Sequence, residues 1–156
     1  MSPTVFIQRV SRLTNIPSDR SLRKWVNAAL AGIKAANGSE ATLRIVNAAE
    51  GRNLNSAFRG KDYPTNILTF VYHEKKSPVL LGDLVICAPV VAREAKDQHK
   101  TLADHYAHLC VHGILHLDGY DHENPRDAKR MESLEVKILG GLGVGNPYLD
   151  VDQHHD

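Results

Sequence analysis

The sequence has few of the features that mark secreted or membrane proteins. Its 156 residues include only two cysteines, Cys87 and Cys110, and both have apolar neighbours. Two buried thiols are typical of a cytosolic protein, since small secreted domains commonly depend on disulfides. The first thirteen residues lack the basic start and apolar core of a secretion signal, and no apolar run is long enough to cross a bilayer. We therefore expect a cytoplasmic protein with no membrane partner.

The chain also lacks a strong net charge, with a formal value of +1 at pH 7. Its charges are unevenly distributed, however. Residues 1–100 carry fifteen Lys or Arg against eight Asp or Glu, whereas residues 101–156 carry four against ten. Such a distribution can place a basic face beside an acidic site and favour an anionic substrate. Two ordinary solvated surfaces would give the same count, and composition leaves both interpretations open.

Length and hydrophobic patterning predict a single α+β domain over residues 1–156. Alternating apolar residues indicate strands, and apolar residues three and four apart indicate helices. We expect a mixed sheet of about four strands that contains a β-meander, packed by about five helices; this arrangement rests partly on the family resemblance that the motifs below carry, because periodicity does not give the strand order. The expected strands are 5–10, Thr42–Val46, Ile67–Tyr72 and Val79–Cys87, and the expected helices are Leu22–Ile33, Leu54–Phe58, Pro89–His99, Leu102–Leu117 and Pro125–Leu139.

The segment from His112 to His122 has a spacing typical of zinc sites. It reads H-G-I-L-H-L-D-G-Y-D-H. On a helix, His112 and His116 lie one turn apart on one face, so two imidazole nitrogens can reach one ion at about 2.0–2.1 Å. Gly119 can end this helix in a left-handed conformation, which lets the chain return His122 to the ion. Three protein ligands would leave a fourth tetrahedral position for water, as in catalytic zinc sites.

A large class of metalloproteases has the same spacing, written H-E-x-x-H-x-x-G-x-x-H, in which the glutamate is the general base. Gly113 occupies the glutamate position in this chain. Amide hydrolysis is therefore an alternative hypothesis that lacks its proton acceptor. The expected helix still resembles the zincin metal-binding helix, and we expect it to lie against the sheet.

The wider pattern resembles the YbeY family of bacterial endoribonucleases. The central match is H-G-x-L-H-L-x-G-Y-D-H at residues 112–122. The other matches follow in order along the chain: Leu54-Asn55 with Phe58-Arg59, Thr65–Phe70, Leu81–Cys87, Met131-Glu132 with Glu135, and Pro147-Tyr148. The resemblance implies that His112, His116 and His122 bind one Zn²⁺ ion and that Arg59 acts with them as a catalytic residue. Asn66 departs from the aspartate common in the family, so a charge-dependent role at this position is in doubt.

The resemblance also implies a substrate and partners. It predicts a zinc-dependent endoribonuclease that is specific for single strands and processes the 3′ end of small-subunit ribosomal RNA, with a role in ribosome quality control. Its expected partners are single-stranded or ribosomal RNA and the small ribosomal subunit or associated proteins. A non-enzymatic assembly factor with structural zinc is a further alternative, although structural zinc sites normally have four protein ligands.

Two routes of RNA cleavage stay open. Zinc could lower the pKa of a bound water toward about 7 so that hydroxide attacks the phosphodiester. Alternatively, zinc could polarise a phosphoryl oxygen while the 2′-hydroxyl of the RNA attacks, which would leave a 2′,3′-cyclic phosphate. In either route the planar guanidinium of Arg59 could hold a phosphate by two parallel hydrogen bonds and offset the growing charge.

Several neighbouring residues have weaker claims. Asp104, His108, His112 and His116 recur every four residues, which places His108 two turns from His116. This is a poor position for a third ligand, so we expect His108 to be structural or to orient a ligand ring. The remaining candidates are Asp118 and Asp121, which could cap the helix or accept a ligand's N–H, and His73, His99 and His105, which have no spacing argument.

Overall fold

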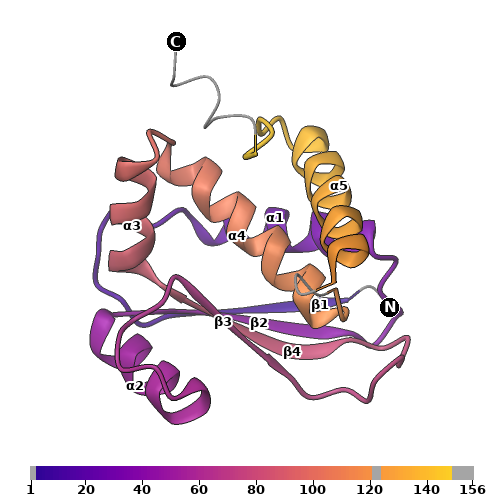
Figure 1. Cartoon of the computed structure of the whole chain (residues 1–156), viewed down its shortest axis with the longest axis horizontal. Helices are drawn as coiled ribbons and strands as arrows, with labels where there is room; N and C mark the ends of the chain where they lie inside the picture. Colours follow the sequence, from indigo (N-terminus) through magenta and orange to yellow (C-terminus); the bar gives the residue numbers. More distant parts are fainter. Residues whose placement is uncertain (1–2, 121–123, 149–156) are drawn as a thin grey trace.

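The computed structural model describes residues 3–120 and 124–148, and Figure 1 shows their helices on both sides of one sheet. The strands are β1 (Thr4–Arg9), β2 (Glu40–Val46), β3 (Ile67–Val71) and β4 (Leu81–Cys87). The helices are α1 (Asp19–Gly32), α2 (Ala48–Arg59), α3 (Ala88–Asp97), α4 (Leu102–Leu117) and α5 (Pro125–Gly141). The predicted α+β class, with about four strands and five helices, is confirmed.

The sheet has the strand order β1-β2-β4-β3. β1 pairs with β2 and β2 with β4 in parallel, whereas β3 pairs with β4 in the antiparallel direction. The sheet is mixed, as predicted, but the expected β-meander is wrong. The chain segments between β1 and β2 and between β2 and β4 contain helices, which allow parallel crossovers. Only β3 and β4 follow each other along the chain without a helix between them. β3 stands last in the strand order and therefore lies at an edge of the sheet.

The main core lies between the sheet and α1, α4 and α5. Residues at alternate positions of the strands point toward these helices and are buried. They are Val5 on β1, Ala41, Leu43 and Ile45 on β2, and Leu84 and Ile86 on β4. A smaller cluster on the opposite face includes Leu68 and Val85, with Leu54 of α2 packed against it. The two faces of the sheet are thus covered unequally, with most of the helical mass on the side of α4 (Figure 1).

Both cysteines are buried and free, as the sequence predicts. Burial raises the pKa of the Cys87 thiol and raises that of Cys110 to about 12. Both side chains therefore stay protonated at neutral pH and act as small apolar groups of the core. Among the residues that the structure describes, no helix combines the length and apolar character needed to cross a membrane.

Helix α4 begins and ends at the residues that the sequence predicts. The side chain of Thr101 accepts a hydrogen bond from the Asp104 N–H and caps its first turn. After Leu117 the chain leaves the helix at Gly119, which has a φ of +98°. The Tyr120 N–H then donates to the Leu115 carbonyl and closes the last turn. Gly119 thus has the left-handed conformation expected of it.

Most other elements differ from the sequence prediction by one to three residues at an end, and two differences have a clear physical cause. Helix α2 begins at Ala48, six residues before the expected start at Leu54. Of its twelve residues only Gly51 and Asn55 are buried, so its first turns carry no apolar periodicity to detect. Strand β4 begins at Leu81, two residues after the expected start at Val79. The backbone N–H of Val79 donates instead to the Ser77 hydroxyl, which holds this residue in a turn.

A candidate metal centre on helix α4

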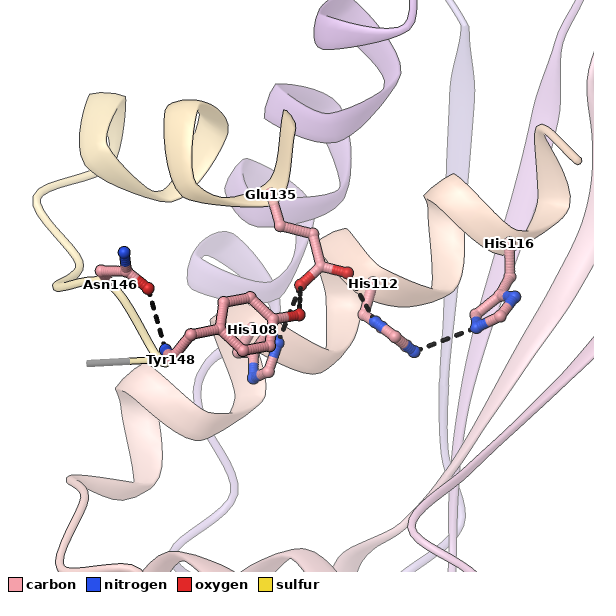
Figure 2. A network of polar contacts seen from close by, with 6 residues as sticks. All are labelled: His108, His112, His116, Glu135, Asn146 and Tyr148. Carbon is pink, nitrogen blue, oxygen red and sulfur yellow. Dashed lines mark hydrogen bonds and ion pairs between the residues drawn. The ribbon is translucent and has the colours of Figure 1, made fainter. Parts of the chain in front are cut away.

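Helix α4 places His108, His112 and His116 on one side, while most of its other side chains are buried in the core. All three histidines are partly buried. The Nε2 atoms of His112 and His116 lie 3.0 Å apart, and Figure 2 shows the two rings turned toward each other. Two nitrogens this close can both reach one cation at about 2.0–2.1 Å. The structure thus brings together two of the three predicted ligands, and the third, His122, lies outside the described residues.

A buried carboxylate from another helix holds the rings behind this pair. Glu135 of α5 is fully buried, and its Oε1 accepts a hydrogen bond of 2.6 Å from Nδ1 of His112. Its Oε2 accepts from Nε2 of His108 at 3.0 Å and from the Tyr148 hydroxyl at 2.6 Å (Figure 2). Four side chains from three parts of the chain therefore meet in one network behind the candidate site.

This network keeps Glu135 ionised at neutral pH. Burial alone would raise the pKa of its carboxyl, but the hydrogen bonds from His108, His112 and Tyr148 outweigh burial and lower the pKa to about 2. Burial and the bond to Glu135 also raise the pKa of Tyr148, so its hydroxyl stays a donor.

A charged Glu135 selects one tautomer of His112. The carboxylate can only accept, so Nδ1 of His112 must carry the proton and Nε2 is left with its lone pair. Nε2 of His112 points toward Nε2 of His116 (Figure 2). Histidines that bind metals usually donate their second ring nitrogen to a carboxylate or carbonyl in this way. His108 shares the same acceptor through its Nε2 atom, so a role in orienting the ligand rings stays a prediction for this residue.

A second possible cation position involves His108, His112 and Glu135, whose ligand atoms all lie within 4.8 Å of one another. An ion there would replace the hydrogen bonds that both histidines donate to Glu135. One of its three ligands, Glu135, has no exposed surface. A catalytic ion needs an open coordination position. The His112–His116 side of the network meets this requirement better, because both of these residues line a cleft.

That cleft has a volume of about 630 Å³ and joins the histidines to Arg59. Arg59 is the exposed last residue of α2. The turn that follows it is held by Asn55, a buried residue whose side-chain amide donates to the Tyr63 carbonyl at 2.7 Å. The cleft therefore contains every predicted site residue that the structure describes, although they come from separate helices.

Strand β3 forms one wall of the cleft. The Asn66 carbonyl accepts a hydrogen bond from the Cys87 N–H, and the Tyr72 N–H donates to the Leu81 carbonyl. The backbone N–H and C=O groups of the even-numbered residues of β3 therefore point toward β4. The alternation of an antiparallel pair then turns the backbone groups of Ile67, Thr69 and Val71 toward the open edge. A ligand in the cleft meets a row of backbone donors and acceptors there.

Asn66 fixes the start of this strand. Its side-chain oxygen accepts from the Ile67 N–H at 2.7 Å, and its NH₂ group donates to Glu94 at 3.1 Å. Glu94 also bonds to Nε2 of His105, a buried residue of α4, at 3.0 Å. The side-chain amide of Asn66 thus has a structural role, and this role requires its NH₂ group as a hydrogen-bond donor to Glu94. An aspartate there would instead face the carboxylate of Glu94.

A second cleft, of about 390 Å³, lies on the other side of His116. It shares Val71 and His116 with the first cleft, and it is also lined by His73, Lys75 and Lys76. Both lysines are exposed. His116 therefore borders both the cleft that contains Arg59 and the cleft that contains two lysines. Asp118 lines the second cleft too, and its backbone caps α4 by donating to Ile114.

Gly113, at the position of the protease glutamate, lines neither cleft and packs against the sheet. A Cβ atom there would lie 2.8 Å from the Cδ1 of Ile67 and from the Cδ2 of Leu84. These atoms belong to the sheet face on which α4 packs, so a side chain at 113 would enter the core. The missing general base is therefore a consequence of how α4 packs, which weakens the hypothesis of amide hydrolysis.

Glu135 and Tyr148 are parts of this centre that sequence reasoning did not assign to it. The signal for Glu135 was present, because Met131, Glu135 and Leu139 are spaced by four residues and are all fully buried. A carboxylate inside an apolar helical stripe needs buried donors as partners. Tyr148 follows the last helix, and no periodic pattern marks its role.

The fold and the site together define a broad class, the α+β proteins that have a pair of helical histidines in an open cleft where a metal ion could bind. Comparison with known proteins narrows this class to one family. The chain belongs to the endoribonuclease YbeY family, whose model matches residues 8–143. The resemblance given by the sequence motifs is thus confirmed.

Two relatives named endoribonuclease YbeY illustrate the match. The protein from Aromatoleum aromaticum is 54% identical over 132 residues, which cover 85% of this chain and 81% of the relative. The protein from Methylobacillus flagellatus is 51% identical over 142 residues, which cover 91% of each chain. The solution structure of a Thermotoga maritima protein shares the fold, with a TM-score of 0.58 and 24% identity over 88% of this chain and 91% of that chain.

The role of Glu135 can be tested by replacing its carboxylate with an amide. We expect Glu135→Gln to lower the affinity for Zn²⁺, used as the probe ion, by about 10–100-fold, because the orientation of His112 is lost. The measurement is competition with a chromophoric chelator. Glu132→Gln, at an exposed position of the same helix, is the control and should bind as the wild type does. An unchanged affinity in a folded Glu135→Gln protein would show that the carboxylate does not position the ligand.

The packing at Gly113 predicts that a protease-like glutamate cannot be restored. We expect Gly113→Glu to lower the free energy of unfolding by about 3 kcal/mol or more, because it places an unpaired charge in the core. Urea unfolding measures this change. Gly140→Glu is the control, since Gly140 is exposed and has open space around its Cβ position. A stable Gly113→Glu protein with peptidase activity would contradict the prediction.

Proposed function

We propose that residues 1–156 act as one domain, a zinc-dependent endoribonuclease that cleaves single-stranded RNA. The observation that carries the proposal is the shared cleft, which Arg59 lines together with the histidine pair His112 and His116. The relatives' names support the choice of RNA as substrate. We further propose that the protein works in the cytoplasm, on ribosomal RNA at the 3′ end of the small-subunit molecule and in ribosome quality control. The small subunit or its associated proteins would be the partners.

The donor set fits a zinc ion. Imidazole nitrogens suit zinc, and the 3.0 Å separation of the two Nε2 atoms allows both to bind one ion. The hydrogen bond from His112 to the Glu135 carboxylate gives the arrangement usual around zinc-bound histidines. We propose His122 as the third ligand, which would leave one position open. When bound, zinc is a Lewis acid that lowers the pKa of water and polarises phosphoryl oxygens.

The protein's own side chains supply the remaining parts of the reaction. The guanidinium of Arg59 is always charged and can bind a phosphate through two parallel hydrogen bonds. Placed across the cleft from the histidines, it would hold the scissile phosphate and offset the charge that grows during cleavage. Glu135 keeps His112 in the required tautomer. The open backbone edge of β3 at Thr69 can orient the RNA strand along the cleft.

Both clefts favour a polyanion over a peptide. Arg59 lines one cleft, Lys75 and Lys76 line the other, and His116 borders both, so a chain of phosphates that followed both clefts would meet these cations in turn. An amide hydrolase would need a proton acceptor, and the position that supplies it in proteases is buried at Gly113. A non-enzymatic assembly factor could use the same basic surface, but it would show no turnover.

Two substitutions test the catalytic proposal on a defined single-stranded RNA. We expect His116→Ala to lose both zinc and cleavage. Arg59→Ala should keep its zinc and fold but lose about a hundredfold or more in kcat, because a group that stabilises the transition state is gone. The measurements are metal content, circular dichroism and single-turnover cleavage.

Arg20→Ala is the control for the arginine, since Arg20 is exposed on α1 and lines neither cleft. If Arg59→Ala cleaves as fast as the wild type, Arg59 has no catalytic role. If the wild type with zinc binds RNA without cleaving it, the assembly-factor alternative replaces the enzyme. The product ends identify the nucleophile, because only attack by the 2′-hydroxyl leaves a 2′,3′-cyclic phosphate.

The second cleft predicts a distinct effect on binding. We expect the double variant Lys75→Gln/Lys76→Gln to raise KM with little change in kcat, because its lysines bind phosphates away from the reacting bond. The salt dependence of RNA affinity should weaken by about 0.7 in log–log slope for each phosphate that the protein no longer neutralises. Lys24→Gln/Lys96→Gln removes the same charge outside both clefts and should leave the slope unchanged. If the wild type and both double variants show the same slope, the RNA does not cross the second cleft.

A further inference from the structure

Aromatic side chains gather in the cleft that contains Arg59. The whole sequence has nine Phe, Tyr or Trp residues, and three of them, Phe58, Phe70 and Tyr72, line this one cleft. Phe58 is 66% exposed and Tyr72 is 64% exposed, the highest values among the large hydrophobic residues of the described chain. Folding does not require this exposure, and apolar surface rimmed by polar groups commonly marks a binding site.

The aromatic rings are held in place without a ligand. Phe58 meets Phe70 edge to face, with ring centroids 5.1 Å apart and an interplanar angle of 76°. The Tyr72 hydroxyl donates to Asp83 at 2.8 Å. Phe70 also packs against the small apolar cluster under α2, so it is a fixed support for Phe58. Rings held in this way lose little conformational freedom when a planar group stacks on them.

We propose that Phe58, supported by Phe70, stacks on an unpaired base of the RNA whose phosphate Arg59 holds, with Tyr72 as a second stacking surface. The inference rests on the proposed function and names the part of the substrate that this wall of the cleft recognises. Stacking on aromatic rings is the usual way in which proteins hold single-stranded nucleic acid without regard to sequence. A base inside a duplex is already paired and stacked, so this interaction selects single strands.

The position of Phe58 beside Arg59 favours a nucleotide over an apolar peptide side chain. Both residues belong to the last turn of α2 and line the same cleft. A nucleotide offers a planar aromatic face and a phosphate close together, which matches one ring and one guanidinium. The rest of this wall mixes apolar residues with the polar Thr65, Asn66 and Thr69, and a base likewise has an apolar face and polar edges.

Three variants test the stacking role with a single-stranded RNA that the wild-type zinc enzyme cleaves. Phe58→Leu keeps apolar volume but removes the ring face, and it should raise KM by roughly fivefold to a hundredfold, the range typical of removing one base-stacking side chain. Phe58→Trp should restore binding. Phe6→Leu is the matched control, because Phe6 is 48% exposed on β1 and lines neither cleft.

A second readout separates stacking from simple packing. An abasic nucleotide is placed at each position around the cleavage site in turn. At one position it should weaken binding to the wild type. The same abasic position should cause no further loss of binding in Phe58→Leu. A 2-aminopurine base at that position should be quenched by the wild type and by Phe58→Trp, but much less by Phe58→Leu.

The inference is overturned if Phe58→Leu binds and cleaves as the wild type does. It is also overturned if the abasic penalties are additive with Phe58→Leu, or if Phe58→Trp fails to restore binding, because Phe58 would then only pack against Phe70. In each of these cases the wild type still cleaves RNA, so the proposed function stands. A wild-type protein that neither binds nor cleaves RNA would defeat both.

Discussion

The structure depends most on one buried carboxylate. A glutamate without exposed surface is tolerated only when its charge is matched by donors, and Glu135 receives three, from His108, His112 and Tyr148. These bonds join α5 and the segment after it to α4. The same bonds fix the tautomer and direction of His112. The contact between α4 and α5 and the orientation of His112 therefore depend on the same hydrogen bonds to Glu135, so a change in one affects the other.

The second constraint is the close approach of α4 to the sheet. A glycine at 113 lets the helix approach Ile67 and Leu84, which places the histidine side of α4 along β3. Since β3 is the antiparallel edge strand, its outer backbone groups face the cleft. Helix α2 then closes the other side with Phe58 and Arg59. The cleft thus follows from the strand order, from one small residue on α4 and from the connection between α2 and β3, which adds Thr65 and Asn66 to its lining.

Local features of this fold could be predicted from the sequence, and non-local ones could not. The spacing of His112 and His116 lies within two turns of one helix, so α4 was predicted with its correct bounds. Pairing partners are chosen in three dimensions, which is why the parallel order of the sheet was missed. Glu135 was missed as a site residue for the same reason, because its partners are 23 and 27 residues away. Arg59 was named through family resemblance, since no spacing links it to the histidines.

The uneven charge of the chain has a structural counterpart. Arg59, Lys75 and Lys76 come from the basic first hundred residues, whereas the histidines and Glu135 come from the acidic remainder. In the proposed enzyme, Glu135 offsets one charge of a divalent ion from behind, and the exposed cations remain in front. The open side of the site then stays positive toward a phosphodiester of charge −1. The carboxylate is fully buried and hydrogen-bonded to the histidines behind the site, so the charged side chains that an anionic strand meets first are Arg59, Lys75 and Lys76.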